Sequence, residues 1–392
     1  MRRANGEGLL RKRSNGTWEG RITIGYDENN KQICKSIYGK TKKEVSDRLK
    51  QMQHDLNKGT YVEPTKTTVS SFFEKWIKDY LIKARDSTKY QYNGYFENYI
   101  NDEIGSVEMQ KVTPEMIQML ISKCYKKPLS AKTVRNLHGI IHHLFADAVR
   151  LRIVNNNPAE YTNLPEVEKK EMLILEGDNL KAFIEEIKGK PFEHLFFIDC
   201  FTGMREGEIL GLTWDCINFE NETILVKQQL KRDSRIGEKS SAYILAPTKT
   251  GNIRLLSPAS SVFDALRKVK AEQSRNKLQY GKAFDNKDNL VFTDPVGRYI
   301  NGRTLLKAFK KRVSAIGLPA MRFHDLRHTY TATALETGDN MKLVSSNLGH
   351  TNISTTMNIY AHLTNKAKKD SANRMETFIK GLDSDKKKRK KA

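Results

Sequence analysis

The first part of the chain alternates between polar and apolar positions. The segments TWEGRITIGY (17–26) and KQICKSIYG (31–39) both follow this period of two, which is typical of β-strands buried on one face. The intervening DENN predicts a turn between them. We therefore expect a β-hairpin in which Ile22 and Ile24 face a helix while Arg21 and Thr23 face outward.

A helix should follow this hairpin, from Thr41 to about Asn57. Thr41 is a suitable N-cap, Glu44 completes a capping box, and Gly59 provides a stop. Hairpin and helix together form a small basic module, followed by the linker VEPTKTT (62–68).

The next ninety residues show helical periodicity only. Aromatic and aliphatic residues recur at helical spacing in VSSFFEKWIKDYLI and in TVRNLHGIIHHLFADAVRL, between Val69 and about Asn157. Thr113 and Pro114 predict a helix start, since proline suits the first helical position. The stretch NNNPAEYTNLPEVEKKE (155–171) breaks every periodicity, so we expect a domain boundary there.

The remainder of the chain mixes helices and strands. We expect helices at 178–187, at 192–201 and from about 303 onward, and strands at 222–229, 241–246 and 253–257. The last two strands are joined by PTKTGN, which we read as a hairpin. The fold class is therefore multidomain: a small α+β hairpin-plus-helix domain at 1–62, an all-α domain at 67–157, and a mixed, mainly α domain with a small antiparallel sheet at 170–392.

Charge narrows the range of partners. The 392 residues include 68 Lys and Arg against 46 Asp and Glu, a net charge of +22, and the chain closes on KKKRKK (386–391). This excess favours a polyanionic partner, most commonly nucleic acid. An anionic membrane is the rival, but no apolar run approaches the roughly 18 residues of a membrane span. The basic N-terminal segment lacks an apolar signal core, and the four cysteines form no CxxC pair, so we expect a cytoplasmic protein with reduced thiols.

One helix carries unusual chemistry. In FHDLRHTYTATALETG (323–338), an apolar stripe is opposed by a polar face, and Gly338 is expected to end the helix. The stripe comprises Phe323, Leu326, Tyr330 and Ala334; the polar face comprises His324, Arg327, His328 and Thr331. The polar face could be merely solvated. It could bind zinc through His324 and His328, although a third ligand is lacking, or it could bind an anion through the arginine fork.

Two further segments decide between these interpretations. TGMREGEILGLTW (202–214) places an arginine after a Thr-Gly break, and LGHTNISTTMNIYAHL (348–363) places a tyrosine ten residues after a histidine. With the helix above, they resemble the tyrosine recombinases, or phage integrase family, most closely the integrases of conjugative transposons and temperate phages. The six residues that match the family pattern in order are Arg205, Lys249, His324, Arg327, His350 and Tyr360.

The resemblance implies a role for each of these residues. Arg205 and Arg327 would hold the nonbridging oxygens of a DNA phosphate, and Tyr360 would attack the phosphorus to form a 3′-phosphotyrosine. Lys249 would protonate the departing 5′-oxygen, with Lys227 and Lys231 as fallback candidates. His324 would move a proton near the tyrosine, and His350 would hydrogen-bond the phosphate. No metal, ATP or other cofactor is expected.

The resemblance also implies partners. The first domain would bind arm sites of double-stranded DNA through Arg21 and Thr23. The second would bind core sites, for which the basic residues around its last two helices are candidates: Lys126, Lys127, Lys132 and Arg135. We expect a homotetramer on paired sites, in the nucleoid of a bacterial cell, and accessory DNA-bending or excision proteins are candidate partners. A C-terminal helix could dock on its own protomer or on a neighbour.

Two other functions remain open at this stage. A type IB topoisomerase would use the same covalent step but rejoin the same strand, and the separate N-terminal module argues against it. A non-catalytic DNA-binding regulator would be favoured by a degenerate set of site residues, whereas here all six positions are filled.

Overall fold

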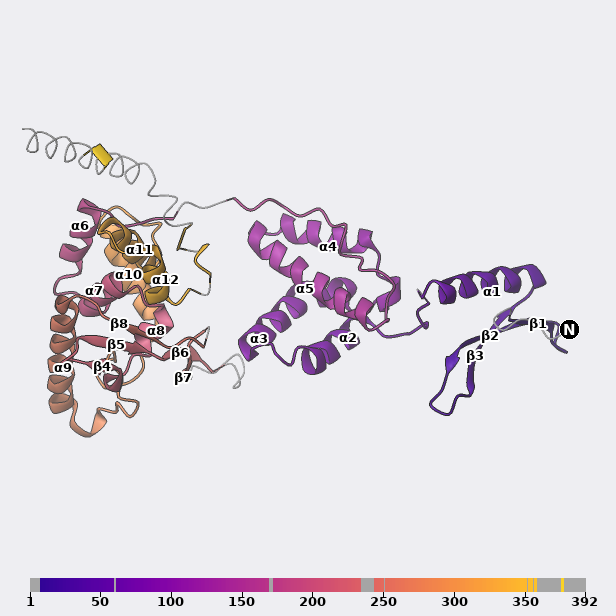
Figure 1. Ribbon diagram of the computed structural model, residues 1–392, viewed down its shortest axis with the longest axis horizontal. Helices are drawn as coiled ribbons and strands as arrows, with labels where there is room; N and C mark the ends of the chain where they lie inside the picture. Colours follow the sequence, from indigo (N-terminus) through magenta and orange to yellow (C-terminus); the bar gives the residue numbers. More distant parts are fainter. Residues whose placement is uncertain are drawn as a thin grey trace, which may run out of the picture. The chain divides into compact units, whose positions relative to one another are not determined.

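The computed structural model describes residues 8–59, 61–168, 172–233, 243–249, 251–350, 352–354, 356–357 and 375–376 (Figure 1). The chain divides into two compact units, Met1–Glu168 and Lys169–Ala392. The further division of the first unit, near residue 62, remains a prediction from the sequence. In the part of the chain that is described, no helix is long and apolar enough to cross a membrane.

The first unit begins with a three-stranded antiparallel sheet. Its strands lie in the order β1 (Leu9–Lys12), β2 (Trp18–Tyr26) and β3 (Gln32–Gly39). The predicted hairpin of β2 and β3 is confirmed, whereas β1 was not expected. Ile22 is buried and Arg21 is exposed, as predicted. Thr23 and Ile24 are both half-buried instead, because a bulge between Thr23 and Gly25 interrupts the alternation.

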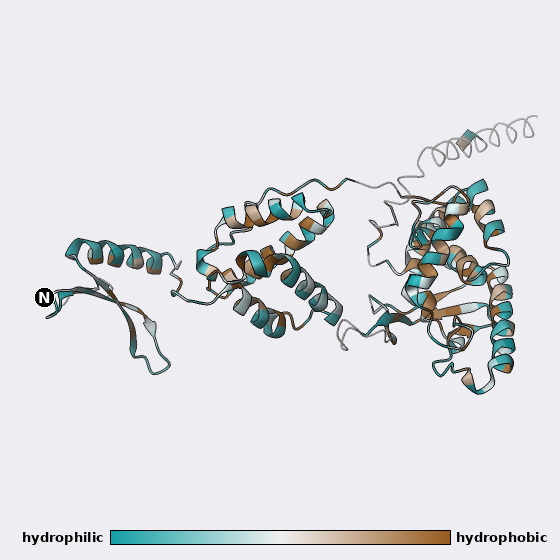
Figure 2. Ribbon diagram, turned by 180° about the vertical axis from the view of Figure 1, so that it is seen from behind, coloured by the Kyte–Doolittle hydropathy of each residue, from teal (hydrophilic) through white to brown (hydrophobic). Residues whose placement is uncertain are grey.

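Helix α1 (Lys42–Asn57) packs on this sheet as the sequence predicts. The Thr41 side chain accepts a hydrogen bond from the Glu44 amide at 3.2 Å, and the Glu44 carboxylate accepts one from the Lys40 amide at 3.2 Å. A Cβ atom on Gly20 would lie 2.3 Å from the Leu49 side chain, so glycine is needed for α1 to approach β2. Figure 2 shows hydrophilic residues along most of α1.

The rest of the first unit is helical. Its elements are α2 (Val69–Lys75) with its π-helical continuation Trp76–Tyr80, α3 (Asp86–Tyr95) with its π-helical continuation Phe96–Gly105, a 3-10 turn at Met109–Lys111, α4 (Pro114–Lys126) and α5 (Ala131–Arg150). Thr113 caps α4 as predicted, accepting from the Met116 amide at 3.3 Å. The core includes a buried hydrogen bond, at 2.7 Å, from the Trp76 indole to the Asp147 carboxylate on α5.

The second unit places helices around two short sheets. The helices are α6 (Asp178–Ile187), α7 (Glu193–Thr202), α8 (Glu206–Leu210), α9 (Ser260–Tyr280), α10 (Gly302–Ala315), α11 (Asp325–Glu336) and α12 (Met341–Leu348). One core joins α6, α7, α10 and the residues just before α11, where the rings of Phe183, Phe196, Phe309 and Phe323 meet. This packing fixes the two helix ends that carry Arg205 and Arg327.

The strand pairing corrects one expectation from the sequence. The strands are β4 (Ile217–Asn218), β5 (Thr223–Val226), β6 (Gln228–Arg232), β7 (Tyr243–Pro247) and β8 (Arg254–Leu256). The expected hairpin of β7 with β8 is wrong, because β7 pairs with β6 and β8 pairs with β5. Only Lys227 separates β5 from β6, whereas residues 248–253 separate β7 from β8. The described residues of PTKTGN therefore lie between two strands with different partners rather than at the tip of a hairpin.

Candidate active site

Arg205 stands where α7 ends and α8 begins. Gly203 caps α7 in the left-handed conformation (φ +60°), and Arg205 is the N-cap residue of α8. The Arg205 guanidinium donates to the Glu208 carboxylate at 2.7 Å, and the Arg205 amide donates to the other oxygen of that carboxylate at 3.0 Å. Nη2 of Arg205 also donates to the carbonyl of Gly349 at 3.3 Å. This arginine is therefore held in place while its guanidinium reaches the loop after α12.

Arg327 reaches the same loop from α11. Its side chain is almost fully buried, at 2% exposure, and donates to the Gly203 carbonyl at 2.7 Å and to the Leu348 carbonyl at 2.5 Å. The two arginines thus bind the carbonyls of consecutive residues, Leu348 and Gly349. Burial, followed by the nearby charge of Arg205, lowers the pKa of Arg327 to about 9. The guanidinium remains protonated at neutral pH, so two positive charges converge just before His350.

The two predicted histidines adjoin these arginines. His350 follows Gly349, is half-buried, and shares a 2.9 Å hydrogen bond with the Thr356 hydroxyl. Burial lowers the pKa of His350 to about 4, and the charges of Arg327 and Arg205 act in the same direction. The pKa of His324 is likewise lowered to about 4, chiefly by burial and then by His328, although part of its surface is exposed. Both imidazoles are neutral at pH 7 in the unliganded protein.

The polar face predicted for α11 is only partly solvated. Arg327 is buried and Thr331 is 0% exposed, with its hydroxyl donating to the Arg327 carbonyl at 2.8 Å. His328 is half-buried and lies edge-on to His324, with ring centroids 5.1 Å apart. The interpretation as a solvated face is therefore wrong for Arg327 and Thr331, whereas His324 is exposed. Across the residues described, no group of three or more His, Cys, Asp or Glu side chains is placed to hold a metal ion.

Two buried charges in this region were missed by the sequence reasoning. Arg254, in β8, is 9% exposed and donates to the Glu208 carboxylate at 2.7 Å. Asp199, in α7, is 1% exposed, and its carboxylate has no hydrogen-bond partner among the described residues. Burial raises the pKa of Asp199 well above its usual range, while the charge of Arg327 opposes this. A signal existed in both cases, since each charged residue interrupts an apolar run, FFIDCF and IRLL.

The other predicted site residues that the structure describes are not joined to this cluster. Lys249 is exposed in the segment between β7 and β8. The fallback candidate Lys227 pairs with Asp215 at 2.7 Å, and Lys231 is exposed on β6. Tyr360 lies outside the described residues, as does most of the predicted C-terminal helix.

The candidate DNA-contacting residues of the first unit are mostly exposed. Lys126 and Lys127 follow each other at the end of α4, and the Lys127 ammonium lies 5.8 Å from the centroid of the Tyr99 ring. Lys132 is exposed near the start of α5, and Arg135 donates to the Pro165 carbonyl at 2.7 Å. In the sheet, Thr23 forms a 3.7 Å contact with the Cys34 sulfur.

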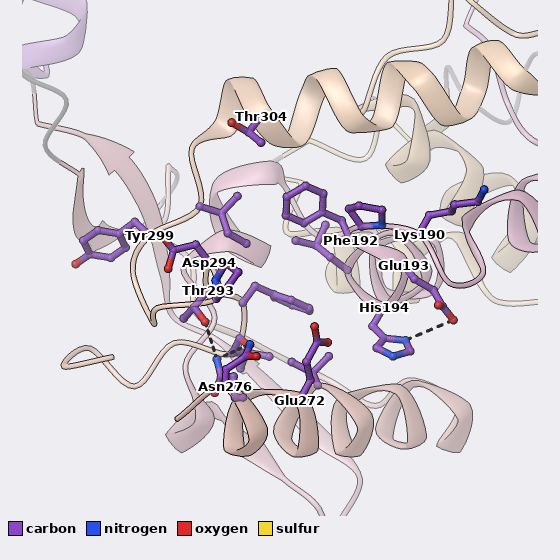
Figure 3. A pocket seen from close by; sticks show the side chains of 18 of the residues that line it. Lys190, Phe192, Glu193, His194, Glu272, Asn276, Thr293, Asp294, Tyr299 and Thr304 are labelled. Atoms are coloured by element: carbon purple, nitrogen blue, oxygen red, sulfur yellow. Dashed lines mark hydrogen bonds and ion pairs between the residues drawn. The ribbon is translucent and has the colours of Figure 1, made fainter. Parts of the chain in front are cut away.

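Figure 3 shows a cavity of about 730 Å³ at the start of α7, whereas Arg205 follows the end of that helix. It is lined by the start of α7, by α9 and by the loop before α10, and its charged residues include Glu193, Glu272 and Asp294. None of the predicted site residues lines it.

Comparisons with known proteins show which family and relatives this chain resembles. Residues 174–367 match the Phage integrase family, and residues 68–142 match the N-terminal SAM-like domain of phage integrases. A tyrosine recombinase XerC-like protein of Caldanaerobacter subterraneus subsp. tengcongensis is 32% identical over 371 residues, covering 91% of this chain and 94% of the relative.

Two solved structures share the fold. The Tn1549 transposon integrase in complex with transposon right end DNA gives a TM-score of 0.67 at 23% identity, covering 79% of this chain and all of that one. A lambda integrase tetramer bound to a Holliday junction gives a TM-score of 0.56 at 15% identity, covering 91% of this chain and 96% of that one.

Proposed function

Because the chain belongs to the phage integrase family of tyrosine recombinases, we propose that it cuts and rejoins double-stranded DNA at specific sites, integrating and excising a mobile element. One observation carries the assignment of the site. Arg205 and Arg327, far apart in sequence, donate to the adjacent carbonyls of Gly349 and Leu348, immediately before His350. A guanidinium that binds a carbonyl oxygen can bind the nonbridging oxygen of a phosphate more strongly, because the phosphate is charged.

The arginines would act on charge that develops at phosphorus. A pentacoordinate transition state carries more negative charge on its nonbridging oxygens than the ground state does, so fixed cations lower its energy selectively. Glu208 holds Arg205, and the Gly203 carbonyl holds Arg327. Both guanidinium groups are therefore oriented before DNA binds. His350, neutral at pH 7, can donate one hydrogen bond to the same phosphate.

Tyr360 would be the nucleophile, ten residues after His350. Its phenol proton leaves to a nearby base, for which His324 is the candidate, and its oxygen forms a bond to phosphorus. The bond from phosphorus to the 5′-oxygen breaks, and Lys249 protonates that oxygen. The product is a 3′-phosphotyrosine and a free 5′-hydroxyl. Attack by the 5′-hydroxyl of a second strand reverses these steps, so the reaction retains the bond energy and requires neither ATP nor a metal.

The parts of the chain would divide the recognition of DNA. We assign arm sites to residues 1–62, core sites to residues 67–157 and catalysis to residues 170–392, working as a tetramer on two paired sites. Separate family matches at residues 68–142 and 174–367 support the last two parts of this division, and the likeness to lambda integrase, over 91% of this chain, supports the shared fold. A net charge of +22 supports the general affinity for DNA.

Strand exchange tests this function against its rivals. The purified protein should be given two labelled duplexes that carry junction sequences of the element, mapped by sequencing the joints formed in cells. Recombinant strands that join the two duplexes are the expected product. Relaxation of supercoiled DNA without any exchange would indicate a topoisomerase, and binding without strand cleavage would indicate a regulator.

A further inference from the structure

Arg254 is a buried arginine that none of the proposed chemical steps uses. It begins β8, and its side chain is only 7% exposed. Nη2 of Arg254 donates to the Glu208 carboxylate at 2.7 Å, and Nε donates to the carbonyl of Asn347 at 2.6 Å. An arginine buried this deeply is stable only when such partners compensate its lost hydration. Its position is therefore set by the two groups that it joins.

The first of these groups also holds Arg205. Glu208 has a completely buried side chain, and its two oxygens are shared between Arg205 at 2.7 Å and Arg254 at 2.7 Å. Burial alone would raise the pKa of Glu208, but the hydrogen bond and charge of Arg254, together with Arg205, bring it to about 2. The carboxylate is thus ionised at neutral pH. Without Arg254, this buried anion would face Arg205 alone.

The second group belongs to the last turn of α12, directly before the loop that carries His350. Asn347, whose carbonyl binds Arg254, is separated from His350 by only Leu348 and Gly349. A Cβ atom on Gly349 would lie 3.3 Å from both Cδ and Nη1 of Arg254, so the loop packs directly against this side chain. Arg254 therefore contacts both the residue that orients Arg205 and the backbone that places the two bound carbonyls.

We propose that Arg254 is a positioning residue for DNA strand cleavage, which orients Arg205 through Glu208 and the loop of His350 through Asn347. This inference rests on the proposed roles of Arg205 and His350. Displacing a group at a reacting centre by about 1 Å can reduce the rate by about 100-fold. Loss of Arg254 should therefore slow cleavage without removing a direct interaction with DNA.

A matched variant separates positioning from simple stability. Arg312, on α10, is 8% exposed and bonds the Glu186 carboxylate at 2.7 Å, so it is a similarly buried arginine away from the arginine cluster, although its partner is partly exposed. Arg254→Met and Arg312→Met should each lower the melting temperature of the full chain. The rate of covalent adduct formation should be measured at saturating protein on a nicked duplex that carries a junction sequence, and the Kd on the same DNA.

We expect Arg254→Met to slow adduct formation about 10- to 100-fold at a Kd within about threefold of the wild type. Arg312→Met should leave the rate unchanged. If both variants slow adduct formation equally, or if Arg254→Met weakens the Kd as much as the rate, the proposal is overturned.

If Arg254→Met does not fold, the rate of adduct formation by Arg254→Lys is measured instead. This variant keeps a charge opposite Glu208 but lacks the fork that also binds Asn347, so its rate should fall, and a wild-type rate would overturn the proposal.

A double variant tests the route through Arg205. The effect of Arg254→Met should shrink severalfold in an Arg205→Ala background, because the residue that it orients is already gone. Full additivity of the two effects would contradict the proposed route. Failure of this inference can also be distinguished from failure of the proposed function. If Arg205→Ala alone cleaves at the wild-type rate, the proposed function fails, whereas if only Arg254→Met is wild-type, this inference alone fails.

Discussion

At the scale of single residues, the site depends on cations that are held by fixed acceptors. Arg327 is almost completely shielded from water and binds two carbonyls instead, while Arg205 is tied to a buried carboxylate. Both side chains therefore lose little further freedom when a phosphate binds. We expect their fixed orientation to matter more than their charge, which a lysine would also supply without the planar fork.

Replacement of Arg327 by lysine tests this directly. The ammonium cannot donate to Gly203 and Leu348 with the geometry of the guanidinium, so we expect about a 100- to 1,000-fold loss in the rate of adduct formation. The Kd for DNA should change far less. Arg275→Lys, at an exposed position on α9, is the control and should behave as the wild type. Equal losses in rate and affinity for Arg327→Lys would indicate a role in binding only.

The histidines predict how stability depends on pH. The pKa of His350 is about 4 in the folded chain, below the ordinary value of about 6.5, so the unfolded chain takes up a proton first as pH falls. The stabilisation is complete above about pH 6.5 and is lost progressively toward pH 4. Glu208, with a pKa of about 2, loses its contribution only below about pH 4.5.

Calorimetry between pH 7.5 and 4.5 measures this effect. The melting temperature of the second unit should fall across this range, and it should fall less in His350→Gln. Parallel curves for the two proteins would show that His350 has an ordinary pKa in the folded chain.

At the scale of elements, three helices meet at Gly203. This residue caps α7 with φ +60°, and a Cβ atom on it would lie 2.6 Å from Tyr330 on α11 and 2.9 Å from Leu348 at the end of α12. Its carbonyl also binds Arg327. One glycine thus allows α7, α11 and α12 to approach closely enough for the two arginines to reach neighbouring carbonyls.

Gly203→Ala should therefore reduce both stability and cleavage. Gly317 is the matched control, since it has φ +78° but no atom within 4 Å of an added Cβ. Gly317→Ala should lower the free energy of unfolding by about 1–2 kcal/mol, the strain of a left-handed alanine. Gly203→Ala should add about 1–3 kcal/mol of overpacking and slow adduct formation. Similar losses for the two variants, in stability and in rate, would contradict this role of Gly203.

Local patterns predicted the elements better than their pairings. Thr41 and Thr113 cap helices where the sequence placed them, because a cap depends on residues within one turn. The partners of β7 and β8 could not be predicted in this way, since pairing is decided by contacts across the whole ribbon. The same limit applies to the site. The order of the arginines and histidines could be recognised in the sequence. The burial of Arg327 and the bridge from Arg254 to Glu208 could not, because they depend on segments that are distant in sequence.

At the scale of the whole molecule, charge governs the approach to DNA. Lys126, Lys127, Lys132 and Arg135 lie around the end of α4 and the start of α5, and all four are exposed. A net charge of +22 gives affinity for any duplex, whereas these four residues are the candidates for a defined contact with a core site. Each phosphate neutralised releases counterions, so the number of neutralised phosphates can be read from the salt dependence of binding.

Changing these four residues to glutamine should flatten that dependence. The slope of log K against log salt should decrease by about 0.9 for each phosphate that the variant no longer neutralises. A control of equal charge changes four exposed lysines of the second unit that are outside the candidate set: Lys181, Lys188, Lys268 and Lys277. The control should change the slope less. Equal changes would mean that only total charge matters.

The identity of the nucleophile is the most direct test of the proposed chemistry. Adduct formed on a nicked duplex should be digested with trypsin, and the DNA-linked peptide should be identified by mass. We expect residues 343–366, LVSSNLGHTNISTTMNIYAHLTNK, whose only tyrosine is Tyr360. Tyr360→Phe should bind the same DNA and form no adduct. Attachment to any other peptide, or undiminished adduct in Tyr360→Phe, would contradict the role of Tyr360 and the mechanism built on it.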